Sequence, residues 1–302
     1  MADSGIQLEA FAPGMYPRSE ALVQATRDLD RGRTGQAEVD GQVEHDLDEL
    51  IAAQQQAGLD LLSDGLLRWQ DHFRPLLEAA EGLETGALTR FLDTNTFYRA
   101  PKATAEAPRL SGPLDGRYAS PLPGPRVGTL PSPYALARGT GVSPEAMAEH
   151  VLAPALAGLD AELVVLVEPF LAPDGAAPGD LEPALEALSN RARLALWFPF
   201  SDAGPLLEQG AADLPVDGLG IDFYATHLDA VPEGFDKLLL AGVVDVRSSV
   251  AEEPEEIARF AARLGDRGVE RIALVPNGDL QYVAEPIARE KLARLGRAKA
   301  AA

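Results

Sequence analysis

The stretch that decides the fold class is LVVLV at Leu163–Val167, followed at once by Glu168 and Pro169. An uninterrupted apolar run of this length is typical of a strand that is buried on both faces of a parallel sheet. Seven further runs of strand length lie along the chain: Ile6–Phe11, Leu59–Ser63, Val127–Leu130, Leu194–Phe198, Gly218–Asp222, Leu238–Val246 and Arg271–Val275. The sequence therefore predicts eight strands of a parallel sheet.

Segments of helical period separate these runs, at Glu38–Ala57, Pro144–Leu159, Asp180–Ser189, Gly204–Ala211, Pro254–Leu264 and Ala284–Leu295. This alternation predicts the α/β class and, with eight strands, a single (β/α)8 TIM barrel that spans residues 1–302. No GxGxxG fingerprint is present, which argues against an open dinucleotide-binding sheet. The segment 82–126 is rich in Pro and Gly, and we predict it to be an excursion over the barrel mouth.

Charge and hydropathy exclude several classes of function. The formal net charge is -21, from 26 Lys and Arg against 47 Asp and Glu, so the surface would repel nucleic acid and anionic lipid. No apolar run is long enough to span a membrane, and the first residues do not resemble a signal peptide. We expect a cytoplasmic protein that binds a small-molecule substrate and neither nucleic acid nor a membrane.

Polar residues just after the strands are the candidate site, because loops at the carboxyl ends of barrel strands form the active site. The predicted catalytic residues are Glu168, Asp222, Asn277 and Asp279. The predicted substrate-binding residues are Arg18, Asp64, Arg68, Trp69, Trp197, Tyr224, Arg247 and Ser248. The aromatic residues Trp69, Trp197, Phe198, Phe200 and Tyr224 would suit a flat ring such as a pterin or a corrinoid.

Each of these residues also has a purely structural interpretation. Glu168 could form an ion pair with Arg18, Arg68 or Arg126. Asp222 and Asp279 could cap the helices that follow them, and Arg247 could bind an anion or neutralise nearby acids. An aromatic stripe of this kind more often serves plain packing than ligand binding.

Histidine and cysteine usage argues against a metal centre. The chain has no cysteine, and its four histidines, His45, His72, His150 and His227, are scattered along it. Only His72 and His227 lie near predicted strand ends, so a clustered histidine site is not expected.

Several short motifs occur in an order that resembles a known family. They are PGMYPR at 13–18, GLD at 58–60, SDGLLRWQD at 63–71, DTNTFYRAP at 93–101, LPSPYALA at 130–137 and VEP at 167–169. Together they resemble the catalytic barrel of cobalamin-independent methionine synthase, in its short single-barrel form, which is related to the uroporphyrinogen decarboxylase barrel. The resemblance implies methyl transfer to the sulfur of homocysteine, with zinc making the thiolate available.

The resemblance fails where the family holds its zinc. The ligand positions that it implies fall on Trp197, Pro199, Asp222 and Gly278, and three of these four have no coordinating group. The acid that the family uses for the substrate ammonium is Val167 here, another acid is Leu66, and a histidine is Arg247. We therefore expect a divergent member without the zinc ligands, with no metal and no tightly bound cofactor.

Three hypotheses about function follow. The first is a methyltransferase-like protein of methionine and one-carbon metabolism that acts on an altered substrate or by a metal-free route, with a folate or methylcobalamin as methyl donor. The second is a catalytically silent protein that binds a ligand or an active paralogue, or forms a homo-oligomer. The third is a metal-free enzyme like uroporphyrinogen decarboxylase, in which Arg18, Arg68, Arg99 and Arg126 would grip an acidic tetrapyrrole.

Overall fold

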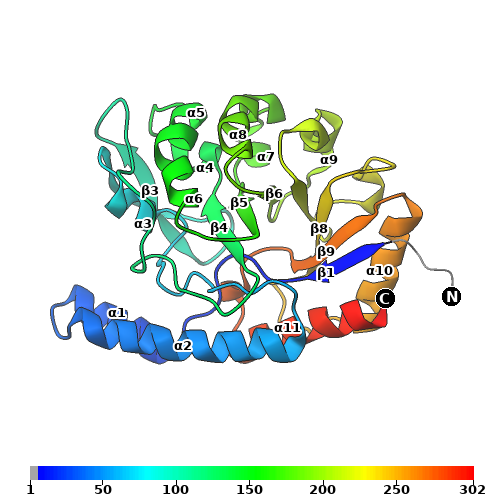
Figure 1. Cartoon of the computed structure of the whole chain (residues 1–302), viewed down its shortest axis with the longest axis horizontal. Coiled ribbons are helices and arrows are strands. Elements are labelled where there is room, and N and C mark those ends of the chain that lie inside the picture. The colour runs from blue at the N-terminus through cyan, green and yellow to red at the C-terminus, as the bar shows by residue number, and fades with distance from the viewer. Residues whose placement is uncertain (1–5) are drawn as a thin grey trace.

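The computed structural model of the chain describes residues 6–302, and Figure 1 shows its arrangement. Seven parallel strands form one curled sheet in the order β1-β9-β8-β7-β6-β5-β4. The strands are β1 (Gln7–Ala10), β4 (Val127–Pro131), β5 (Leu163–Val167), β6 (Leu194–Phe198), β7 (Gly218–Asp222), β8 (Leu238–Val244) and β9 (Arg271–Pro276). The predicted α/β class is thus confirmed, and β5, β6 and β7 begin and end at the predicted residues.

The prediction of a strand at Leu59–Ser63 is wrong, so the sheet has seven strands where eight were expected. This segment makes a single parallel bridge, between Leu62 and Arg126. It also donates one backbone hydrogen bond from Asp60 to the Ala10 carbonyl of β1, at 2.9 Å. Pairing stops at Ser63 because the side-chain amide of Gln54 bonds both its backbone N–H and its carbonyl, each at 2.9 Å. At Ser63, the side chain of Gln54 from α2 thus makes the backbone hydrogen bonds that a neighbouring strand would make.

Large side chains fill the interior of the curled sheet. Trp197 on β6 and Phe11 after β1 are fully buried there, together with branched residues of β5, β8 and β9. Gly220 on the neighbouring β7 makes room for the indole, because a Cβ at that position would lie 2.3 Å from Trp197 Cδ1. The interior is a packed core, as expected when a parallel sheet curls on itself.

Helices cover the outside of the sheet. They are α1 (Glu20–Asp30), α2 (Gln36–Ala57), α3 (Arg74–Ala79), α4 (Pro133–Ala137), α5 (Pro144–Met147), α6 (Ala153–Leu156), α7 (Leu171–Asp174), α8 (Glu182–Ser189), α9 (Gly204–Glu208), α10 (Pro254–Asp266) and α11 (Glu285–Ala301), with a π-helical turn at Ala148–Leu152. In Figure 1, α2 and α11 run along the bottom, and α4 to α9 lie at the top. Gly296 of α11 touches α2, since a Cβ there would lie 1.6 Å from the Ala57 carbonyl oxygen. None of the helices within residues 6–302 has the length and apolar character needed to cross a membrane.

The excursion at 82–126 contains a hairpin that the sequence analysis did not predict. Its strands, β2 (Leu83–Arg90) and β3 (Phe97–Ala103), are antiparallel. Phe91 and Tyr98 of the hairpin are buried and their rings pack on Phe170, which follows β5, at centroid distances of 5.9 and 6.0 Å. Aromatic packing therefore holds the hairpin against the carboxyl end of the sheet.

Candidate functional site: the mouth of the sheet

Glu168 directly follows β5 and is 1% exposed. One carboxylate oxygen accepts hydrogen bonds from the backbone N–H groups of Phe170 and Leu171, each at 2.8 Å, and the other accepts from the Ser132 hydroxyl. Burial is the main influence on this group and raises the pKa of Glu168 to about 7, although the hydrogen bonds oppose the rise. The carboxyl group thus joins the loops after β4 and β5, and the predicted arginine partners are absent from its hydrogen bonds.

Asp222 and Asn277 form a second buried unit, at the ends of β7 and β9. The Asp222 Oδ1 atom accepts from Tyr224 N at 2.8 Å and from Asn277 Nδ2 at 3.1 Å. Asn277 in turn accepts from Val246 N at 3.0 Å. Burial raises the pKa of Asp222, although these hydrogen bonds oppose the rise. Asp222 therefore caps the turn that follows it, in agreement with its structural interpretation.

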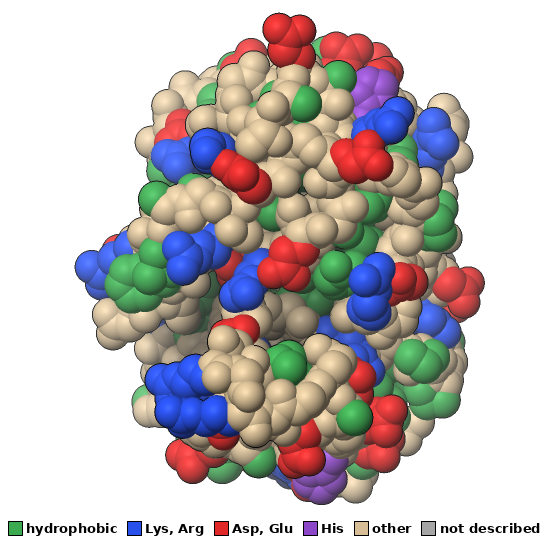
Figure 2. Space-filling view, turned by 90° about the vertical axis from the view of Figure 1, so that its left-hand side faces the viewer, with side chains coloured by type: hydrophobic (Ala, Val, Ile, Leu, Met, Phe, Trp, Pro, Cys, Tyr) green, Lys and Arg blue, Asp and Glu red, His purple; other side chains and the backbone are tan. Residues whose placement is uncertain are grey.

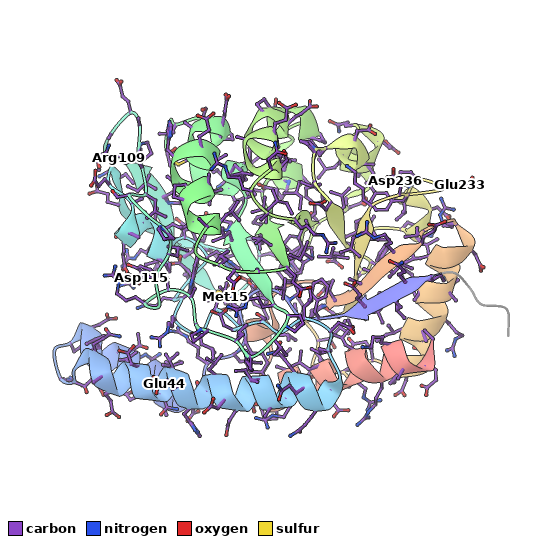
Figure 3. All side chains as sticks on the ribbon, in the orientation of Figure 1. Met15, Glu44, Arg109, Asp115, Glu233 and Asp236 are labelled. Carbon is purple, nitrogen blue, oxygen red and sulfur yellow. The ribbon has the colours of Figure 1, made fainter. Side chains whose placement is uncertain are left out.

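Asp279 is the third buried carboxylate, and it pairs with a histidine. Its Oδ2 atom lies 2.6 Å from His72 Nε2, and its Oδ1 atom accepts from Met15 N at 3.0 Å. Met15 lies in the middle of the molecule, whereas Glu44, Arg109, Asp115, Glu233 and Asp236 lie at its periphery (Figure 3). Gly14 must be a glycine here, because its φ is 84° and a Cβ would lie 2.2 Å from Asp279 Oδ1.

The sequence places His72 near the mouth without a partner, and in the structure it pairs with Asp279. Its side chain is 6% exposed, and that of Asp279 is 4% exposed. Burial opposes protonation, but the charge and hydrogen bond of Asp279, with a contribution from Asp71, outweigh it and raise the pKa of His72. The other ring nitrogen, Nδ1, is buried and has no hydrogen-bond partner among residues 6–302.

Two more buried polar atoms near the mouth lack partners within the described chain. They are Trp197 Nε1 and Ser201 Oγ, at and after the end of β6. Trp197 is close to the His72–Asp279 pair, since the same Cβ on Gly14 that would strike Asp279 would lie 3.6 Å from Trp197 Cζ3. Buried polar groups in proteins normally have partners, so these two atoms are exceptions in an otherwise hydrogen-bonded region.

At two of the positions implied for zinc ligands, aromatic side chains take up the space. Trp197 is fully buried, and a Cβ on Gly278 would lie 2.2 Å from the ring of Phe200. No group of three or more His, Cys, Asp or Glu side chains able to share a metal ion occurs within residues 6–302. Of the four positions, only Asp222 carries a side chain that binds metals, and zinc in proteins needs about three such ligands.

Arg247 lies at the rim of the mouth. Its guanidinium donates to Asp93 Oδ1 at 2.9 Å and stacks over the ring of Phe200, 4.2 Å from the centroid. Phe200 has a left-handed backbone, with φ 59°, and its ring meets that of Tyr282 edge on at 5.3 Å. Asp93 belongs to the connection between β2 and β3, so this ion pair ties the hairpin to the loop after β8.

The remaining predicted binding residues lie apart from the buried pair. Asp64 accepts from Leu66 N at 2.9 Å and from Ser120 N at 3.2 Å, and Trp69 is 1% exposed with its Nε1 bonded to the Tyr118 carbonyl at 2.7 Å. Both therefore anchor the excursion. Burial raises the pKa of Asp64.

Tyr224 lies on the outer surface near α10, and Ser248, in the loop after β8, is partly exposed. Tyr224 is 54% exposed and lines a groove with Phe223, Glu252 and Phe260, while the Ser248 hydroxyl accepts from Val250 N at 3.2 Å. The predicted aromatic wall is therefore wrong as a single surface. Its physical reason is strand alternation, since Trp197 points into the sheet interior and the next residue, Phe198, belongs to the outer core.

Arg18 and Arg68 come together, but beside the mouth. Both line a cavity of about 340 Å³ between α1, α2 and the loop after residue 66. Figure 2 shows a hollow, edged by Lys and Arg and by Asp and Glu, on the face that lies to the left in Figure 1. The sequence analysis grouped these two arginines with Arg99 and Arg126 around one acidic ligand, and of these four only Arg18 and Arg68 line the cavity.

Comparison with known proteins shows which solved structures share this fold. No family model matches the sequence, and no curated protein is similar to it in sequence. Among solved structures, a B12-independent methionine synthase from Shewanella sp. W3-18-1, in complex with selenomethionine, is similar with a TM-score of 0.73 and 15% identity, over 97% of this chain and 96% of that one.

Two further structures are similar over nearly the whole chain. One is from Listeria monocytogenes and carries the provisional name of a vitamin-B12-independent methionine synthase, with a TM-score of 0.70, 16% identity and coverage of 97% and 98%. The other is a methyltransferase from Methanosarcina mazei, with a TM-score of 0.53, 16% identity and coverage of 97% and 95%. The resemblance found in the sequence motifs is confirmed at the level of structure: this chain has the fold of the B12-independent methionine synthases, in a strongly diverged form.

Proposed function

We propose that this chain is a methyltransferase-type protein that acts on a small molecule other than homocysteine and uses the His72–Asp279 pair where its structural neighbours' family would use a zinc-bound thiolate. The observation that carries the proposal is the buried 2.6 Å contact between His72 and Asp279, with His72 Nδ1 left without a partner. A carboxylate that fixes one ring nitrogen and leaves the other free is the arrangement of a general base.

The donor set at the expected zinc positions does not fit that metal. Trp197, Pro199 and Gly278 offer no ligand atom, and the Oδ1 atom of Asp222 already accepts two hydrogen bonds. Thiolate formation on zinc is therefore not available to these residues. We derive no step through a metal ion.

Proton removal by His72 would activate the methyl acceptor in place of thiolate formation on zinc. In the neutral imidazole, Nε2–H donates to Asp279 and Nδ1 carries the lone pair. An acceptor X–H would lose its proton to Nδ1 while its electron pair forms the new X–CH₃ bond, and the methyl donor would keep the electron pair of the bond that breaks. Asp279 would stabilise the imidazolium that results.

The test combines turnover with metal analysis. Purified protein is incubated with 5-methyltetrahydrofolate or methylcobalamin and a panel of small thiols, amines and hydroxy compounds, and methylated products are found by mass spectrometry. We expect a product other than methionine, no stoichiometric zinc, and a loss of about 100-fold or more in turnover for His72→Gln. His45→Gln is the control, because His45 is 64% exposed. Methionine formation with one bound zinc per chain, or full activity of His72→Gln, contradicts the proposal.

A second candidate is a catalytically silent ligand-binding protein. It is favoured by the burial of Glu168, Asp222 and Asn277, whose polar atoms already bond to the protein. No turnover with any acceptor, together with a ligand-induced rise in melting temperature that Trp197→Phe weakens, would support it over the enzyme.

A further inference from the structure

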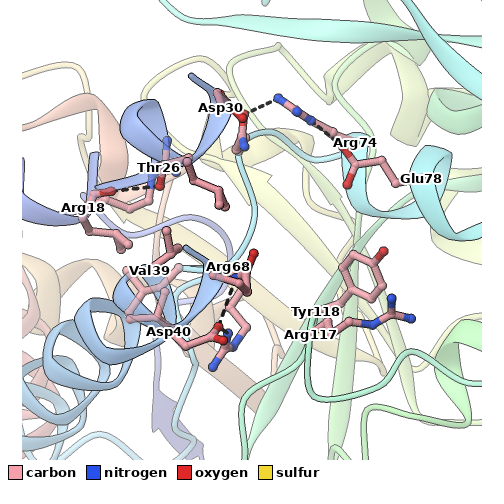
Figure 4. A pocket seen from close by; sticks show the side chains of 16 residues that line it. Arg18, Thr26, Asp30, Val39, Asp40, Arg68, Arg74, Glu78, Arg117 and Tyr118 are labelled. Carbon is pink, nitrogen blue, oxygen red and sulfur yellow. Dashed lines mark hydrogen bonds and ion pairs between the residues drawn. The ribbon is translucent and has the colours of Figure 1, made fainter. Parts of the chain in front are cut away.

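The cavity beside the mouth lies between two parts of the chain that are distant in sequence. Leu22, Leu29, Val39, Val43 and Leu67 supply its apolar surface. Figure 4 shows Arg18 and Thr26 on the α1 side and Arg74, Arg117 and Tyr118 facing them from the other side. The volume of about 340 Å³ is at the lower end of the range for small-molecule pockets, about 300–1,000 Å³.

The cavity is balanced in charge in a protein that is otherwise strongly acidic. Its lining carries Arg18, Arg68, Arg74 and Arg117 against Asp30, Asp40 and Glu78, and Asp115, which pairs with Arg117, brings the nearby carboxylates to four as well. The whole chain has a net charge of -21. The four guanidinium groups therefore make this place less repulsive to an anion than the acidic surface around it.

Three of these arginines are neutralised by the protein itself. Arg68 lies 2.7 Å from Asp40, Arg74 lies 2.7 Å from Glu78, and Arg117 lies 3.0 Å from Asp115. The first two pairs hold the Arg68 and Arg74 side chains at the cavity, whereas the Arg117 pair is exposed to solvent.

Arg18 differs from them, because it forms no ion pair among residues 6–302. It is half-buried, and burial lowers its pKa while the more distant charge of Asp46 opposes this. The Asp46 oxygens are already used, accepting from Ser19 N at 3.0 Å and from Gln42 Nε2 at 2.8 Å. A half-buried cation without a partner is costly, and a bound anion would remove that cost.

We infer that this cavity is a binding site for a small organic anion, with a carboxylate or phosphate on Arg18 and an apolar body against Leu22, Val39 and Tyr118. The planar fork of a guanidinium matches both anionic groups. The site is separate from the His72–Asp279 pair, so the inference does not depend on the proposed function.

Isothermal titration of the full chain with four probes tests the inference. They are 4-phenylbutyrate, phenyl phosphate, the neutral 4-phenylbutanamide and inorganic phosphate. We expect at least one of the two organic anions to bind about tenfold more tightly than both the amide and inorganic phosphate, because it alone uses both the charge and the apolar surface. The two anionic probes distinguish a carboxylate site from a phosphate site. Failure of both to bind, or binding no tighter than that of the amide, overturns the inference.

Arg18→Gln is the diagnostic variant, and Arg31→Gln, an exposed residue at the end of α1, is its charge-matched control. Arg18→Gln should weaken the preferred anion about tenfold or more, and Arg31→Gln should change its affinity less than about twofold. The ligand-free Arg18→Gln protein should melt at the same or a higher temperature than the wild type. Unchanged affinity, or a large fall in the melting temperature, would show that Arg18 serves the structure and would overturn the inference.

Discussion

At the mouth, the Glu168, Asp222 and Asp279 carboxyl groups accept hydrogen bonds from the protein's own backbone and side chains, whereas Arg18 in the adjacent cavity forms no ion pair among the described residues. The two regions lie on neighbouring loops but differ in whether the protein itself supplies partners for their buried charged groups. The mouth is neutralised from within, so removing a partner there should damage the fold. In the cavity the Arg18 guanidinium has no ion-pair partner among the described residues, so a substitution of Arg18 should affect binding more than folding.

The sharpest test of this contrast is Asp279→Ala. The substitution leaves His72 buried without its carboxylate and Met15 N without an acceptor. We expect a loss of about 3–5 kcal/mol in the free energy of unfolding, measured with urea. Asp115→Ala, which removes an exposed ion pair with Arg117, should leave the midpoint unchanged. Near-normal stability of Asp279→Ala would break the comparison.

Glu168→Gln should produce the next largest effect, and only as a function of pH. Since the pKa of Glu168 is raised from 4.5 to about 7 in the folded protein, its contribution to stability is fully present below pH 4.5 and is lost as the pH rises toward 7. The variant cannot titrate at this position. Its stability relative to the wild type should therefore increase between pH 5 and pH 8 by on the order of 3 kcal/mol, read from urea unfolding at several pH values. A difference that stays constant with pH would contradict the assigned shift.

Two serines permit a matched test of the mouth against the surface. Ser132 and Ser143 both cap helices, accepting from Ala135 N at 3.0 Å and from Ala146 N at 3.2 Å, and each is followed by proline. Ser132 also donates to Glu168. We expect Ser143→Ala to cost about 1 kcal/mol and Ser132→Ala about 2–3 kcal/mol, by thermal or urea unfolding. Equal costs would show that the bond to Glu168 adds nothing.

The rim should respond least. The Arg247 and Asp93 side chains are 40% and 78% exposed, so their 2.9 Å ion pair is well hydrated. Arg247→Gln should change the free energy of unfolding by less than about 1 kcal/mol, and 1 M salt should reduce that difference further. A larger, salt-independent loss would assign the effect to packing of Arg247 on Phe200.

The sequence correctly predicted the strands that are buried on both faces. It failed where a side-chain contact determines whether a segment pairs as a strand. Leu163–Val167, Leu194–Phe198 and Gly218–Asp222 have the predicted bounds because an apolar run buried in this way has no alternative partner. Leu59–Ser63 looks similar in sequence, but the Gln54 amide takes up the backbone of Ser63. The hairpin escaped prediction because Leu83–Arg90 shows no regular alternation of apolar and polar residues.

The sequence allowed single residues of the candidate site to be predicted, but it did not show which of them contact one another. Placement after a strand was enough to select Glu168, Asp222, Asn277 and Asp279. Nothing in the sequence pairs Asp279 with His72, which lies 207 residues away. Arg18 and Arg68 were grouped only within one hypothesis, together with Arg99 and Arg126, and the cavity that the two share depends on the path of α1 and α2. Long-range contacts of this kind come from the closed fold and leave no local pattern.

The pairing of β1 with β9 sets a condition on the order of folding. Gln7 pairs with Arg271 and Ala10 with Leu274, so during synthesis from the N-terminal end β1 cannot pair with β9 until residues 271–274 have been made. The β4 to β8 portion, whose neighbours follow one another in the chain, can assemble earlier. Because Asp279 and its link to Met15 come after β9, the mouth can be completed only in the last stage of folding.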